Sequence, residues 1–315
     1  LARSTRLGRY ASDKKTTQAK FSRFRDQNNT LFACGDGFID ELTLENGSLV
    51  PKTVVLDTLD LGSLLVVSDE KGDLPENDSP YHFTTLAFHE ESGGKYVFAG
   101  TKRGAVVKLS LGDSLDDTDD NSENDLVSAC VPVCAFQLHD ALINSLAFCV
   151  VDGKGFAATS SDDGTVKVWP CDFGTAHLVE ATHGAGVRVV SACFSLDQSD
   201  SLEVITAATD GSIGRLDVWN RCYSFLAQSV SGGRAKINAI ANDPVHQKIV
   251  AIACDDGVVR GIDVSDRVGA TLFTCRDETK NVSRNEKPGR ATSLGFRRRL
   301  DGSQKNPENN TVSRL

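Results

Sequence analysis

Histidine, serine and aspartate side chains recur in this sequence in combinations that could support nucleophilic chemistry. His139, Ser161 and Asp163 are the three residue types of a hydrolase triad. Ser161 falls on a predicted inner strand, however, and no nucleophile elbow or oxyanion loop accompanies it. We therefore expect no catalytic residue here, and the sequence predicts a protein that is not an enzyme.

The sequence also lacks the common patterns for metals and cofactors. His82 and His89 are seven residues apart across a predicted strand, and Cys130 and Cys134 are isolated, so neither pair suits a metal. No phosphate-binding loop, dinucleotide-binding glycine pattern or His-Glu-x-x-His motif occurs. We expect no metal, no cofactor and no small-molecule substrate.

Four carboxylates instead stand in equivalent turns, each directly before a glycine. They are Asp36, Asp163, Asp210 and Asp256. Aspartate side chains accept hydrogen bonds from the backbone N–H groups of turns, so we expect a repeated capping role. The glycines of these turns and of a fifth are Gly37, Gly104, Gly164, Gly211 and Gly257, at intervals of 67, 60, 47 and 46 residues.

Each glycine separates two short apolar runs, and Ala158–Trp169 is the best-formed example. Glycine takes a positive φ without a Cβ clash, so this pattern predicts a β-hairpin. The fifth residue after each glycine is large and apolar: Leu42, Leu109, Trp169, Leu216 and Ile262. A repeat with a period of about 40 to 50 residues is typical of β-propeller blades.

Five hairpins in a common register resemble the WD40-repeat β-propeller family, over about Ala19 to Phe296. The family's Trp-Asp pair ends the third strand of each blade, and that slot here holds Trp169-Pro170, Leu216-Asp217 and Ile262-Asp263. The resemblance implies an all-β propeller with five intact four-stranded blades and a partial sixth. It also implies that the chain is part of a seven-bladed ring.

The resemblance further implies a hydrogen-bonded structural tetrad of His139, Ser161, Asp163 and Trp169. A buried indole N–H and a buried imidazole need polar partners, which a serine and an aspartate can supply. His183 could brace the next repeat in the same way. We expect Ala208 and Leu216 to remove two of its partners.

The boundaries that we expect follow from charge and pattern. Residues 1–18 are basic and predicted to be a loop or the remnant of a preceding element, and residues 19–315 form the propeller. Residues 112–125 are an acidic, disordered insertion. The fourth strand of the first repeat is expected at Thr53–Leu56 or Leu64–Val67, and Trp219-Asn220 at a turn.

The composition indicates the cellular compartment that we expect for the protein. The chain of 315 residues has a net charge of −9, contains no methionine and begins with Leu1, which indicates a fragment of a longer protein. Nine scattered cysteines favour a reducing intracellular compartment, either cytoplasm or nucleus and nucleolus. No run approaches the roughly 18 apolar residues of a membrane span, so we expect no membrane partner.

A scaffold that binds other proteins in a multi-subunit complex is the function we expect. The residues predicted to face a partner are Arg188, Arg234, Lys236 and Arg290, which open successive repeats, and RNA is an alternative ligand for them. Residues 231–241 and 253–264 resemble one blade of small-subunit processome propellers, which implies ribosome biogenesis and rRNA processing. A substrate receptor of a ubiquitin ligase and a propeller enzyme are the alternatives.

Overall fold

The computed structural model describes β-structure in a series of separate ranges. These are residues 16–21, 30–45, 48–52, 82–91, 94–111, 130–173, 176–196, 201–227, 235–243, 248–265, 269–276, 295–296 and 312–313. None of these ranges contains an α-helix, so no helix among them could cross a membrane.

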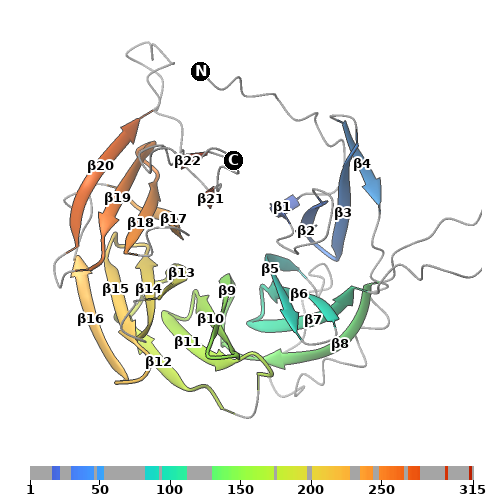
Figure 1. The fold of residues 1–315 in the computed structure, drawn as a ribbon, viewed down its shortest axis with the longest axis horizontal. Helices are drawn as coiled ribbons and strands as arrows, with labels where there is room; N and C mark the ends of the chain where they lie inside the picture. Colours follow the sequence, from blue (N-terminus) through green and yellow to red (C-terminus); the bar gives the residue numbers. More distant parts are fainter. Residues whose placement is uncertain are drawn as a thin grey trace, which may run out of the picture. The chain divides into compact units, whose positions relative to one another are not determined.

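Consecutive strands pair into five four-stranded antiparallel sheets (Figure 1). The first two sheets comprise β1 (Thr16–Phe21), β2 (Thr30–Gly35), β3 (Phe38–Glu45) and β4 (Ser48–Lys52), then β5 (Phe83–Glu91), β6 (Gly94–Thr101), β7 (Ala105–Leu111) and β8 (Cys130–Gln137). The third comprises β9 (Ile143–Val151), β10 (Lys154–Ser161), β11 (Thr165–Pro170) and β12 (Val179–Thr182).

The last two sheets have the same order of strands. They comprise β13 (Val189–Leu196), β14 (Leu202–Ala208), β15 (Ile213–Asp217) and β16 (Cys222–Ala227), then β17 (Ile237–Asn242), β18 (Ile249–Cys254), β19 (Val258–Asp263) and β20 (Ala270–Arg276). A short pair, β21 (Gly295–Phe296) and β22 (Val312–Ser313), completes the described strands. The expectation of an all-β fold made of four-stranded sheets is confirmed.

The chain divides into two compact units, and the division falls within β9. Unit 1 is Leu1–Leu146 and unit 2 is Ala147–Leu315. In unit 1 the first two sheets share a core that includes Phe32, Ile39, Phe83 and Leu109. In unit 2, β13 contacts both β10 and β17, so successive sheets pack face to face.

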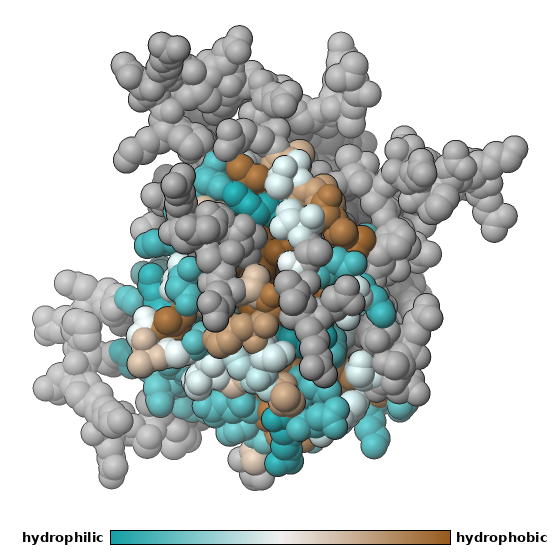
Figure 2. All heavy atoms as spheres, turned by 90° about the vertical axis from the view of Figure 1, so that its left-hand side faces the viewer, coloured by the Kyte–Doolittle hydropathy of each residue, from teal (hydrophilic) through white to brown (hydrophobic). Residues whose placement is uncertain are grey.

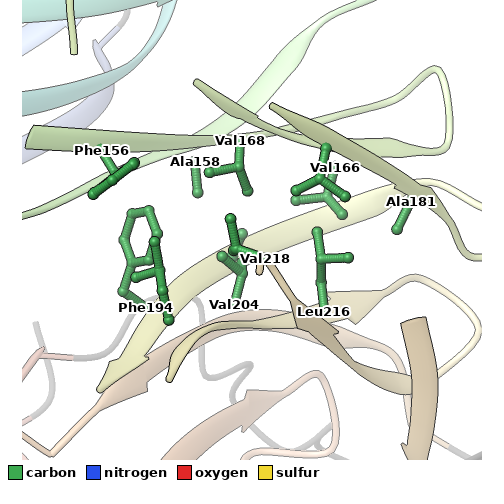
Figure 3. Packing of buried hydrophobic residues seen from close by; sticks show 12 residues of the cluster. Phe156, Ala158, Val166, Val168, Ala181, Phe194, Val204, Leu216 and Val218 are labelled. Atoms are coloured by element: carbon green, nitrogen blue, oxygen red, sulfur yellow. The ribbon is translucent and has the colours of Figure 1, made fainter. Parts of the chain in front are cut away.

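The core between the third and fourth sheets shows how strand alternation builds unit 2. Residues two apart on a strand point to the same face, so Val166 and Val168 of β11 face the fourth sheet. Val204 and Leu216 meet them from β14 and β15, and Figure 3 shows these side chains facing one another between the two sheets. The third and fourth sheets are therefore held together mainly by burial of apolar surface.

The turn glycines have the backbone conformation that the hairpin pattern requires. All five have positive φ, between 72° at Gly37 and 88° at Gly164. At Gly164 an added Cβ would also lie 2.8 Å from the carbonyl oxygen of Val187. This turn therefore needs glycine both for its φ and for the close approach of the following loop.

Three expectations about boundaries need correction or a limit. The fourth strand of the first sheet is β4, Ser48–Lys52, and neither Thr53–Leu56 nor Leu64–Val67. Asn46-Gly47, a dipeptide typical of tight hairpins, precedes it in the sequence. β1 begins at Thr16, inside the segment expected to be a loop or the remnant of a preceding element. The acidic insertion 112–125 lies outside the described residues.

The outer strands of unit 2 carry exposed apolar side chains. Phe225 on β16 and Leu272 and Phe273 on β20 are each at least 38% exposed. These strands lie on the side of Figure 1 that faces the viewer in Figure 2, where hydrophobic side chains appear among hydrophilic ones. The fourth strand of each of these two sheets is thus a partly apolar edge.

Candidate functional site

The turn aspartates of unit 2 hold the start of the strand that follows them. Asp163 Oδ1 accepts hydrogen bonds from the backbone N–H and the hydroxyl of Thr165, at 2.9 and 2.7 Å. Asp256 Oδ1 accepts from the backbone N–H of Val258 at 2.9 Å. Asp36, in unit 1, has a different contact: its carboxylate lies 3.5 Å from Nδ1 of His82.

A chain of hydrogen-bonded polar groups links His183, which follows β12, to the fourth sheet, and all of its members except Asp210 are buried. The hydroxyl of Ser212 donates to Asp210 Oδ1 at 2.6 Å, so Ser212 Oγ must accept from Nδ1–H of His183, which is 2.8 Å away. Nε2 of His183 is then the acceptor for the Thr206 hydroxyl at 2.7 Å. We assign this tautomer because it satisfies all four groups at once.

The surroundings of His183 keep the imidazole neutral. Its ring contacts those of Tyr223 and Phe225, with centroids 5.6 and 5.7 Å away. Burial lowers the pKa of His183 to about 4, and the nearby Asp210 carboxylate opposes that shift only in part. Burial likewise raises the pKa of Tyr223 to about 12. The group is therefore an uncharged brace near neutral pH.

His183 braces the fourth sheet, as the sequence allowed, and the loss of two partners expected at Ala208 and Leu216 does not leave its imidazole unpaired. Its hydroxyl partners are Thr206, two residues before Ala208, and Ser212 in the turn. Thr206 is the fifth residue before its turn glycine. The same position in the third repeat is Thr159, so a hydroxyl repeated in this register was the available signal.

The predicted tetrad is only partly described by the structure. The indole N–H of Trp169 donates to the hydroxyl of Thr159 at 3.1 Å, and Thr159 is not a member of the predicted tetrad. Trp169 pairs with Ala157 across the strands, so Thr159 is its diagonal neighbour and Ser161 lies farther along. His139 is buried in unit 1 and the other three residues lie in unit 2, so the tetrad as a whole stays a prediction.

The structure describes two of the four basic residues that are predicted to face a partner. Arg188 is exposed, and its Nη1 lies 3.4 Å from Asp162 Oδ2. Lys236 is exposed, and its backbone N–H donates to Asp255 Oδ1 at 2.9 Å. Arg234 and Arg290 lie outside the described residues. The basic patch therefore stays a prediction, and each described cation has a carboxylate nearby.

In the part of the chain that the structure describes, no three His, Cys, Asp or Glu residues lie where they could hold a metal ion. Trp219 and Asn220 lie in the turn after β15, which confirms that interpretation of the sequence.

Comparison with known proteins agrees with this architecture. The family model described as WD domain, G-beta repeat, matches residues 130–170. WD repeat-containing protein 90 of Mus musculus is 36% identical over 101 residues, which are 32% of this chain and 5% of that protein. DNA damage-binding protein CMR1 of Chaetomium globosum is 24% identical over 182 residues, 58% of this chain and 34% of that protein.

A solved structure extends the likeness to most of the chain. The crystal structure of the WD40 β-propeller domain of Doa1 superposes with a TM-score of 0.54 at 14% identity, covering 85% of this chain and 70% of that one. The chain spans only a small part of the curated relatives it matches. The glycine turns, the four-stranded sheets and these matches together show a WD40-type β-propeller fold, and residues 130–170 match a single WD repeat.

Proposed function

We propose that this chain is a non-catalytic scaffold domain that binds other proteins within a multi-subunit complex. The observation that carries the proposal is that side chains in unit 2 with the chemistry of a catalytic triad are hydrogen-bonded to one another within the fold. His183, Ser212 and Asp210 are bonded to one another, and the first two are buried. Groups committed in this way stabilise the sheets and do not face a substrate.

The proposed site for a protein partner lies where the chain enters the first strand of the fourth and of the fifth sheet. Arg188 and Lys236 directly precede β13 and β17, and the backbone of each is tied to the glycine turn of the same sheet. Rigid backbone with exposed cationic side chains suits recognition of an acidic protein surface. An intracellular location, cytoplasmic or nuclear, is part of this proposal.

A more specific version of the proposal places the protein in ribosome assembly. It rests on the one-blade resemblance to small-subunit processome propellers, and RNA would then be a ligand of the cationic residues. A salt series of binding to an RNA oligonucleotide tests this version, because binding of phosphates by Lys and Arg weakens steeply as salt increases.

The test is affinity purification of the full-length protein with quantitative mass spectrometry. We expect a defined set of co-purifying proteins that the double variant Arg188→Glu, Lys236→Glu loses by at least several-fold. Lys154→Glu is the matched control, because Lys154 is also exposed but lies at the other end of β10 from the glycine turn. The control should keep the set intact.

Two outcomes would contradict the proposal. One is recovery of the protein without stoichiometric partners under gentle conditions. The other is a set of partners that survives both variants equally, which would remove Arg188 and Lys236 from the interface. Loss of partners only after ribonuclease treatment would replace the protein-binding scaffold with an RNA-binding one.

A further inference from the structure

Trp219 lies half in solvent although tryptophan is the largest apolar side chain. Its side chain is 50% exposed, whereas Trp169 is only 6% exposed. The indole of Trp219 rests edge-on against Phe156, with ring centroids 5.5 Å apart and an interplanar angle of 80°. The contact fixes one part of the indole and leaves the rest accessible on the surface of unit 2.

The turn that carries Trp219 is held firmly at both ends. We call residues Val218–Arg221 the Trp219 turn. The backbone N–H of Val218 donates to the carbonyl of Leu202 at 2.9 Å. The carboxylate of Asp217 accepts from the backbone N–H and the side-chain amide of Asn220, at 2.9 and 2.7 Å. A rigid aromatic loses little conformational entropy when a partner binds it.

Arg221 occupies a backbone conformation that normally belongs to glycine. Its φ is +51°, in the left-handed region, where a residue with a Cβ costs about 1 kcal/mol or more. Glycine would remove the strain, so the local backbone conformation does not itself favour an arginine at this position. The exposed guanidinium stands two residues from the exposed indole.

We propose that the Trp219 turn is a protein-binding hot spot that takes a segment presenting a carboxylate beside a large apolar side chain. Tryptophan and arginine are the residues most enriched in such hot spots. The Asp217 carboxylate is engaged by Asn220, so Arg221 is the charge that the turn presents to a partner. A carboxylate can bind its guanidinium through two parallel hydrogen bonds, while the apolar side chain covers the indole.

This proposal rests on the proposed function in that both concern protein binding, but it uses a different surface. Arg188 lies beside the glycine turn between β14 and β15, since its backbone N–H approaches Thr209. The Trp219 turn follows β15 and lies at the opposite end of that strand. A partner at one end of the sheet can therefore be lost without loss of a partner at the other.

The test uses the full chain as bait for a phage-displayed library of random dodecapeptides. We expect selected peptides that pair Asp or Glu with Leu, Phe or Trp, with binding then measured by fluorescence anisotropy of labelled synthetic peptides. Trp219→Ala should weaken binding by about 30-fold or more, as truncation of a hot-spot residue does. Arg221→Gly should weaken it several-fold while raising the thermal midpoint, because strain is removed.

Phe225→Ala is the matched control, because Phe225 is a comparably exposed aromatic of the same sheet. It should leave the affinity unchanged. Peptides that respond to Phe225→Ala and not to Trp219→Ala would overturn the proposal, as would a selection dominated by basic peptides or no selection at all. Each of these results leaves the partners dependent on Arg188 and Lys236 untouched, so the proposed function is judged separately.

Discussion

Acidification should destabilise unit 2 because His183 is buried there in its neutral form. The unfolded chain releases this proton with an ordinary pKa of 6.5, whereas burial lowers the pKa in the folded state to about 4. Between these values the unfolded state binds more protons. The free energy of unfolding therefore falls as the pH falls through that window.

The size of the effect follows from the two pKa values. One pKa unit corresponds to about 1.4 kcal/mol, so lowering the pH from 7 to 5 should cost about 2 kcal/mol and lowering it to 4 about 3 kcal/mol. These are upper values, because small shifts of the backbone can admit water to the imidazole. Below pH 4 the folded state also binds the proton, and the loss from His183 stops growing.

Urea unfolding at pH 7 and pH 5 measures this loss, and both tryptophans lie in unit 2 to report it. His183→Gln keeps hydrogen-bonding groups but cannot titrate, so its loss on acidification should be about 2 kcal/mol smaller than that of the natural chain. All other titrating groups are common to the two proteins.

An equal loss of stability in His183→Gln and in the natural chain would refute the reasoning. It would mean that His183 is charged in the folded state or that water reaches it freely. A titration of its ring protons by NMR gives an independent check, since the folded pKa should lie well below 6.5.

Three further outcomes are expected. Gly164→Ala should lower the free energy of unfolding by about 2 kcal/mol or more, and Gly153→Ala by less in the same urea assay, because both have positive φ but nothing surrounds Gly153. Equal losses would contradict the role of the Val187 carbonyl. Leu216→Ala should cost about 3 kcal/mol, since it is 1% exposed in the core of unit 2, and a loss below about 1 kcal/mol would contradict that packing. The exposed thiols of Cys222 and Cys275 should react rapidly with Ellman's reagent in the native chain, and the double Ser variant should lose that fast phase. Retention of the phase would show another thiol to be accessible.

The sheets were predictable from local signals, and the polar contacts between side chains were not. Aspartate-glycine turns between alternating runs marked the second and third strands of four sheets, because turn chemistry depends on adjacent residues. The partner of Trp169 depends on cross-strand register instead. Ala157 is its pair, which places Thr159 within reach of the indole.

The hydrogen bonds of His183 were missed for a related reason. Two of its partners come from different parts of the next sheet: Thr206 lies within β14, and Ser212 lies in the turn before β15. Neither residue occupies position 208 or 216, where the family pattern predicts the partners of the histidine. The position of β4 was predictable from a local signal, because Asn46-Gly47 is a dipeptide typical of tight hairpins.

His183 follows directly after β12 of the third sheet, yet it binds hydroxyls that belong to the fourth. When one of these sheets unfolds, its neighbour loses these hydrogen bonds. The unfolding of the two sheets should therefore be coupled, like that of adjacent repeats in a one-dimensional array. Damage to a single strand here is then transmitted along the array as lost cooperativity and does not remain a local defect.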